Sequence, residues 1–187
     1  MKTISPQDLN NLQLQTLLQT AIAPRPIALA STIDKEGNIN LSPFSFFNLF
    51  SSNPPVVIFS PARRVRDNTT KHTLENVLEI PEVVIGIVNY KIVQQISLAS
   101  TEYSKAENEF IKSGLTMKDA DLVQPKLIDE CPVNLECKVL EVKPLGTEGG
   151  AGNLVICEII KIHVQEEYLN EEGNLDQIKL DLVARLG

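Results

Sequence analysis

Four basic side chains lie close together in the first half of the chain, at Arg63, Arg64, Arg66 and Lys71. The protein as a whole is acidic, with a formal net charge of -7. Guanidinium and ammonium groups recognise phosphate and carboxylate groups through charge-assisted hydrogen bonds. A local cluster of cations in an acidic chain therefore suggests a binding site for an anion.

Polar residues that favour helix N-termini, Asp67 to Thr70, stand among these cations. Asn and Asp are good N-caps, so we expect a helix from about Asn68 to Glu79, before Pro81. The free amides at a helix N-terminus favour an anion, and with arginines and hydroxyls nearby they form a phosphate cradle. The alternative is a capped helix whose arginines are solvated on the surface.

A second candidate stretch, Asn40 to Asn48, precedes the basic cluster. Apolar and polar residues alternate from Ile39, as in a half-buried strand, but Pro43 interrupts the pattern. Proline donates no ladder hydrogen bond, so this must be an edge, a bulge or a strand end. Free backbone groups there can bind a planar heterocycle; the alternative is an edge strand with a bulge. Together the two stretches predict a site for an anionic, aromatic ligand.

The remaining polar residues give weaker indications. His72 and His163 are the only histidines, and neither has a serine or cysteine partner visible in the sequence, which disfavours a hydrolytic triad. Histidines and cysteines are too few to predict a transition-metal site, so we assign no metal. The Gly149–Gly152 loop lacks the Lys-Ser/Thr of a phosphate loop and is interpreted as a flexible hairpin. Glu107 and Glu109 are expected to be solvated.

Length and composition indicate one globular domain spanning residues 1–187, with 43% hydrophobic residues. The acidic charge argues against a nucleic-acid partner, and apolar stretches of strand length argue against a membrane span. The three cysteines, Cys131, Cys137 and Cys157, show no metal-binding spacing and suit a reducing compartment. We therefore expect a cytoplasmic protein.

Strand patterns outnumber helical ones along the chain. We expect helices around residues 14–18, 68–79, 91–100 and 106–112, and strands at 27–33, 39–44, 56–60, 83–88, 133–142, 154–164 and 180–186. A bulge is expected after Val139, where the alternation changes phase. This order predicts a mainly β fold with flanking helices, in which an antiparallel sheet closes into a small barrel. No GxGxxG follows a strand, so a Rossmann dinucleotide site is not expected.

Four segments of the chain, in order and spacing, resemble the flavin reductase-like family. They are PRPIALAST from Pro24, GNINLSPFSFFN from Gly37, SSNPPVVIFSP from Ser51 and RDNTTK from Arg66. ENEF, ECPVNLEC and the closing ARLG fit the same family more loosely, so that the resemblance spans nearly the whole chain. It implies the FMN-binding split barrel, an antiparallel Greek-key-like sheet.

The resemblance also implies a homodimer that holds FMN without covalent attachment near the subunit interface. The flavin ring would lie along Asn40, Ser42, Pro43, Phe44, Ser45 and Asn48. The phosphate would be held by Arg66, Asn68, Thr69 and Lys71. Ser31, Thr32, Phe59 and Ser60 would lie nearby, with Arg25 as a further candidate contact. The family usually continues past RLG with a glycine and an aromatic residue near the flavin, so the resemblance leaves that wall unassigned.

These residues suggest an oxidoreductase in which NAD(P)H reduces FMN and the electrons pass to an acceptor. The acceptor is free flavin, a ferric chelate, a monooxygenase or an electron-transfer protein. Because the cofactor carries the chemistry, we assign no catalytic side chain. Two alternatives stay open: a flavoredoxin-type FMN carrier reduced by a protein partner, and a non-catalytic module that binds flavin or another anion.

Overall fold

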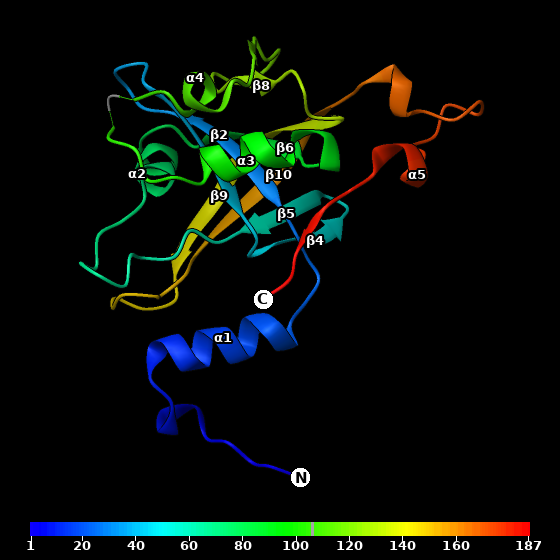
Figure 1. The fold of residues 1–187 in the computed structure, drawn as a ribbon. Coiled ribbons are helices and arrows are strands. Elements are labelled where there is room, and N and C mark those ends of the chain that lie inside the picture. Colours follow the sequence, from blue (N-terminus) through cyan, green and yellow to red (C-terminus); the bar gives the residue numbers. More distant parts are fainter. Residues whose placement is uncertain (106) are drawn as a thin grey trace.

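The computed structural model describes residues 1–105 and 107–187, whose centre is an antiparallel sheet with the strand order β3-β2-β6-β9-β10-β5-β4 (Figure 1). Its strands are β2 (Ala28–Ile33), β3 (Ile39–Phe44), β4 (Phe47–Ser52), β5 (Pro55–Phe59), β6 (Glu82–Ile87), β9 (Val133–Pro144) and β10 (Asn153–Val164). Two small sheets pair β1 (Arg25–Pro26) with β11 (Ala184–Arg185), and β7 (Met117–Lys118) with β8 (Leu127–Ile128). The predicted mainly β architecture is confirmed.

The helices pack on both faces of this sheet, except for the first, which buries no residue and stands away from it. They are α1 (Asn11–Ala21), α2 (His72–Glu79), α3 (Val93–Ala99), α4 (Glu109–Ser113) and α5 (Gln177–Leu180), with 3₁₀ turns at Pro6–Asp8, Tyr90–Ile92 and Glu166–Tyr168. Because side chains alternate along β2, Ala28 and Ala30 join one core with α2, while Leu29 joins another with α3 and α4. These two cores fix α2 and α4 on opposite sides of the β3 edge.

Strand β3 lies at an edge of the sheet, with β2 as its ladder partner. Its register places Pro43 opposite Leu29 and Asn40 opposite Thr32. This placement agrees with the expectation from Pro43, since an edge strand leaves the proline side of the backbone without a ladder partner. The other edge of the sheet is β4.

The longest hairpin joins β9 to β10, which lie side by side inside the sheet (Figure 1). Its register shifts between Ile156 and Cys157, opposite Glu141 and Val139, so Leu140 is the extra residue of a bulge. The predicted bulge after Val139 is therefore confirmed.

Several predicted boundaries were wrong. Strand β4 was not predicted, because it pairs with β5 through contacts that its irregular FNLFSS pattern does not indicate. Helix α2 begins at His72 instead of Asn68, since Asn68 takes a left-handed conformation with φ 57°. The strand expected at 180–186 is reduced to β11 after α5. Helix α4 begins at Glu109, and the part of its prediction that falls on Ala106 lies outside the described residues.

The three cysteines are buried free thiols inside the two cores. Among the described residues, every helix is too short or too polar to cross a bilayer.

Candidate functional site

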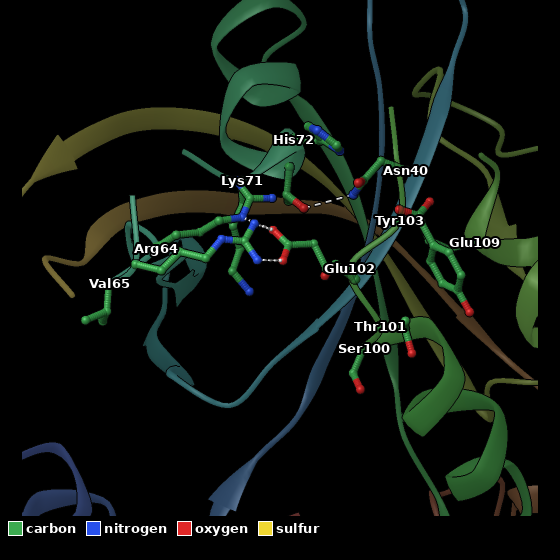
Figure 2. A pocket seen from close by; sticks show the side chains of 13 residues that line it. Asn40, Arg64, Val65, Lys71, His72, Ser100, Thr101, Glu102, Tyr103 and Glu109 are labelled. Carbon is green, nitrogen blue, oxygen red and sulfur yellow. Dashed lines mark hydrogen bonds and ion pairs between the residues drawn. The ribbon is translucent and has the colours of Figure 1, made fainter. Parts of the chain in front are cut away.

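A cavity of about 360 Å³ lies beside the free edge of β3 (Figure 2). Small-molecule sites commonly measure roughly 300–1,000 Å³. Side chains from four parts of the chain line the cavity: β3, the arginine turn, the start of α2 and the connection that leads into α4. The lining residues are Asn40, Ser42, Arg64–Arg66, Lys71–Thr73, Ser100–Tyr103 and Glu109.

The backbone of β3 presents an unusual edge to this cavity. The amide of Leu41 points away from β2 and donates to Glu109 Oε2 at 3.1 Å. Backbone groups alternate in direction along an antiparallel strand, so Pro43 occupies the equivalent position two residues on. The free edge of β3 therefore offers carbonyl acceptors to a ligand, but it lacks a second amide donor because Pro43 has no N–H.

Glu109 approaches the cavity from α4 and is 6% exposed, so its predicted solvation was wrong. Burial raises the pKa of this carboxyl, against the hydrogen bond from the Leu41 amide. The orientation of the Asn40 amide that satisfies both of its polar atoms places its nitrogen 3.2 Å from Glu109 Oε1. Glu109 thus fixes the β3 edge from the side that faces α4.

The basic cluster forms a tight turn that its own side chains hold together. Arg63 Nε donates to Asn68 Oδ1 at 2.7 Å, and the Asn68 amide nitrogen donates to the carbonyl of Thr147 at 2.9 Å. The Arg63 amide also donates to the carbonyl of Ala151 at 2.9 Å. The Asn68 side chain is therefore committed to the turn and to its contact with the β9–β10 hairpin.

The glycine-rich tip of that hairpin packs directly on the arginine turn. A Cβ at Gly149 would lie 3.0 Å from Val65 Cα, closer than side chains normally approach backbone. The glycines thus allow the close contact that holds the turn, and they serve as a support for it.

Lys71 occupies the N-cap position of α2 and makes no side-chain capping hydrogen bond. Its Nζ lies 5.3 Å from the centroid of the Phe44 ring. Burial, together with the neighbouring Arg64, lowers the pKa of this lysine. Among the described residues Lys71 forms no ion pair with a carboxylate, so its ammonium group is an unpaired cation in the cavity wall.

The donor set fits a flavin mononucleotide. Cationic Arg64, Arg66 and Lys71 at one end suit a phosphate, and the Asn40 and Ser42 side chains suit the polar edge of a heterocycle. The buried Ser31 hydroxyl and the Asn76 amide oxygen have no hydrogen-bond partner among the described residues, although Asn76 Nδ2 donates to Thr32 Oγ1.

The structure brings some of the predicted site residues together and separates others. Asn40, Ser42, Arg66 and Lys71 line the cavity, and Thr69 lines an adjoining hollow that shares Arg64 and Arg66. Pro43 and Ser45 are half-buried at the end of β3, and Asn48 is exposed on β4. Buried elsewhere are Ser31, Thr32, Phe44, Phe59, Ser60 and Arg25.

Phe44 and Phe59 form a tilted ring pair, 5.3 Å between centroids, inside the core beneath α2. Arg25 Nη1 donates to the carbonyls of Gln19 and Ile22 at the end of α1, while its Nε and Nη2 have no partner among the described residues.

Several cavity residues were not assigned to the site from the sequence. Thr73 follows His72 in α2, where its hydroxyl lies at hydrogen-bond distance, 2.9 Å, from the Asn40 side-chain amide. Glu102 and Glu109 come from the connection after α3 and from α4, 36 and 68 residues from their partners Arg66 and Leu41. No spacing pattern connects residues so far apart, so only the tertiary fold shows them to be neighbours.

A separate polar cluster joins Asp121, Glu136 and His163, whose ligand-type atoms lie within 4.8 Å of one another. Glu136 is fully buried and accepts from the amides of Asp121 and Leu122 at 2.9 and 2.7 Å. His163 Nε2 lies 2.5 Å from Glu136 Oε1, and Lys161 pairs with Asp121. These contacts make the cluster a clamp between the 119–128 segment and the β9–β10 hairpin; the absence of a metal site stays a prediction.

Comparison with known proteins places this geometry in a family. Residues 20–179 match the family model of the flavin reductase like domain. An uncharacterized protein of Aquifex aeolicus is 34% identical over 93% of this chain and 86% of its own.

Two solved structures share the fold over most of their length. Nitrilotriacetate monooxygenase component B from Bacillus cereus has a TM-score of 0.92 and 29% identity, covering 100% of this chain and 92% of its own. A putative flavin reductase with a split barrel domain from Shewanella frigidimarina has a TM-score of 0.82 and 26% identity, covering 97% and 88%. The sheet is thus a split barrel, and the chain belongs to the flavin reductase like domain family.

Proposed function

We propose that this protein is an oxidoreductase that binds FMN non-covalently in the cavity beside β3 and accepts electrons from NAD(P)H. The observation that carries the proposal is the pairing of a cationic end, with Lys71 free of a carboxylate partner among the described residues, with a polar strand edge in one cavity. Family membership and the flavin reductase neighbour support a flavin as the ligand.

The phosphate belongs at the cationic end, held by Arg64, Arg66 and Lys71. Thr69 stands beside these cations, but its hydroxyl and amide both donate to Asp67 Oδ1, at 2.6 and 3.0 Å. The flavin ring belongs along the β3 edge, where Asn40, Ser42 and the strand carbonyls provide polar contacts. The bound flavin supplies hydride acceptance and electron transfer, and the protein positions it and balances its charge.

The onward acceptor is proposed from the solved neighbours. The Bacillus cereus neighbour is a component of a monooxygenase, which favours a partner enzyme that consumes reduced flavin. We place this chemistry in the cytoplasm because all three cysteines are free thiols.

We also propose a homodimer. None of the residues of α1 is buried, and the helix stands away from the sheet in Figure 1. At the β4 edge, Leu49 and Phe50 are 59% and 64% exposed. An unpaired strand edge with exposed apolar side chains is a typical surface for a second subunit.

The test is to purify the protein with added FMN, record its visible spectrum and then mix it with NADH or NADPH in a stopped-flow instrument. Bound flavin that bleaches rapidly with one nicotinamide supports the reductase. A flavin that binds tightly but is inert to both nicotinamides supports the carrier. Failure to bind FMN at micromolar concentration would refute the proposal.

A further inference from the structure

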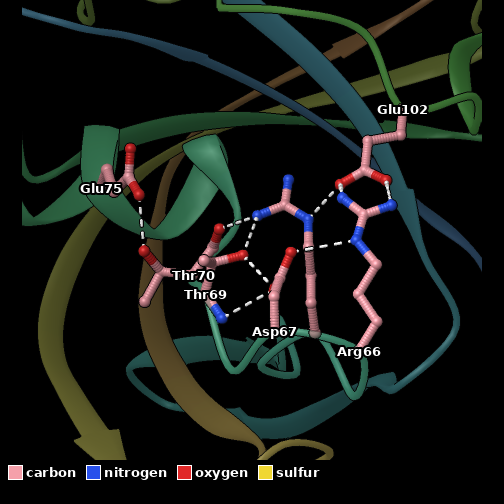
Figure 3. A network of polar contacts seen from close by, with 7 residues as sticks. Arg66, Asp67, Thr69, Thr70, Glu75 and Glu102 are labelled. Carbon is pink, nitrogen blue, oxygen red and sulfur yellow. Dashed lines mark hydrogen bonds and ion pairs between the residues drawn. The ribbon is translucent and has the colours of Figure 1, made fainter.

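Glu102 closes the cationic end of the cavity with a carboxylate that belongs to the protein itself (Figure 3). Its Oε1 accepts from Arg66 Nη2 at 2.9 Å, and its Oε2 pairs with Arg66 Nη1 at 2.8 Å. The same Oε1 contacts Arg64 Nε. Both arginines that line the cavity therefore meet one carboxylate.

These contacts use the faces that a phosphate would use. Arginine binds carboxylates and phosphates alike through two parallel N–H donors of its guanidinium fork. Glu102 takes both donors of that fork on Arg66, and Arg66 Nε is bound to Asp67 at 3.0 Å. Arg64 Nη1 is bound to Thr69 Oγ1 and to the carbonyl of Thr70. An incoming phosphate would therefore have to compete with Glu102 for the fork of Arg66 and for the Nε of Arg64.

The charges lead to the same conclusion. Glu102 and Asp67 together balance Arg64 and Arg66, which leaves Lys71 as the cavity cation without a carboxylate partner among the residues that the structure describes. A phosphate dianion next to Lys71 would share the cavity with the Glu102 carboxylate, and the two negative charges would repel each other. The dianion thus needs more positive charge than the closed arrangement offers.

We propose that Glu102 is a built-in competitor for the phosphate group, and that a phosphate ester must displace it from Arg64 and Arg66 to bind. The proposal rests on the proposed function of this cavity. Displacement is feasible because Glu102 lies in the connection between α3 and α4 and its side chain is 43% exposed. Rotation of the side chain into solvent would release both guanidinium groups.

The competitor determines which ligands the site admits. A flavin without a phosphate gains nothing from displacing Glu102, whereas FMN recovers two arginine contacts when it does so. Removing the Glu102 charge should therefore strengthen FMN binding and leave riboflavin binding unchanged. A residue that merely oriented the arginines would give the opposite result, because its removal would weaken FMN binding.

The test compares the wild-type protein with Glu102→Gln, which keeps the size and removes the charge. Glu141→Gln is the matched control, since Glu141 is exposed on β9 and its substitution changes the net charge equally. Dissociation constants for FMN and riboflavin are measured by quenching of flavin fluorescence. Each exposed ion pair changes an equilibrium constant by up to about fivefold, and Glu102 pairs with two arginines. We therefore expect the dissociation constant of FMN to be about three- to tenfold lower for Glu102→Gln. Riboflavin should stay within about twofold on the same scale.

An unchanged or weakened FMN affinity in Glu102→Gln would overturn the proposal. If the wild-type protein binds no flavin, the proposed function fails, and inorganic phosphate then tests the competitor alone. In that assay phosphate should raise the melting temperature of Glu102→Gln more than that of the wild-type protein or Glu141→Gln, and equal shifts would refute it. Glu102→Thr serves as a second variant, with circular dichroism to verify folding.

Discussion

Glu136 is a buried acid whose removal should strongly destabilise the fold. Its carboxylate is fully buried on β9, accepts the Asp121 and Leu122 amides at 2.9 and 2.7 Å, and contacts His163 at 2.5 Å. Glu136→Ala leaves two amides and a histidine without their acceptor. Removing one partner of a buried pair costs about 3–5 kcal/mol, so we expect the free energy of unfolding to fall by that amount at neutral pH.

The pH dependence provides a second, independent measure of the same contacts. Burial alone would raise the pKa of Glu136, but hydrogen bonds from the Asp121 and Leu122 amides and from His163 outweigh burial and lower it. A carboxyl whose pKa is lower in the folded than in the unfolded protein stabilises the fold above its unfolded pKa. This stabilisation is lost as the pH falls through the folded pKa. The stability difference between wild type and Glu136→Ala should therefore shrink in acid, below about pH 4.

Urea unfolding followed by far-UV circular dichroism measures both effects, with equal m-values as the check for two-state behaviour. Glu141→Ala, on the exposed side of the same strand, is the control and should change stability by less than about 0.5 kcal/mol. A loss below about 1 kcal/mol for Glu136→Ala would refute the clamp, since an average point substitution costs as much. A stability difference that stays constant from neutral to acid pH would contradict the assigned pKa direction.

Three further substitutions test the core, the phosphate contact and the dimer. Phe59→Ala should lower the free energy of unfolding by about 3–5 kcal/mol, because its ring is fully buried. The FMN affinity of the folded fraction should be retained, and a loss of affinity without a loss of stability would place the ring in the ligand site. Lys71→Met should weaken FMN binding about tenfold or more, as loss of a charge-assisted hydrogen bond does, and spare riboflavin. Equal losses for both flavins in a titration would argue against a phosphate role. Phe50→Asp should convert a dimer to a monomer in sedimentation velocity, and an unchanged sedimentation coefficient would exclude the β4 edge as the interface.

The parts of the fold that were predicted correctly depend on local patterns. Alternation along Ile39–Phe44 and Val133–Val139 indicated the two strands, although their polar faces are also buried at Asn40, Asn134 and Glu136. The change of phase after Val139 indicated the bulge at Leu140. Proline chemistry likewise restricted this strand to an edge, a bulge or a strand end, and β3 lies at an edge. These features need no knowledge of distant residues.

The parts that were missed depend on distant residues. Asn68 looked like a helix cap, yet Arg63 and Thr147 hold its side chain in the turn and delay the start of α2 to His72. Glu109 looked solvated until the fold placed it against Leu41. The sequence indicated two walls of the cavity, the β3 strand and the arginine turn. The wall that carries Glu102 could not be predicted, because that residue comes from the distant connection between α3 and α4.

The three buried cysteines give the protein an internal reporter of unfolding. Burial raises the pKa of Cys137 to about 12 and keeps the pKa values of Cys131 and Cys157 far above that of a free thiol. Thiol reagents attack the exposed thiolate, so the native protein should resist modification until the core opens. Because Cys131 lies in one core and Cys137 and Cys157 in the other, their labelling rates would show whether the two faces of the sheet open together.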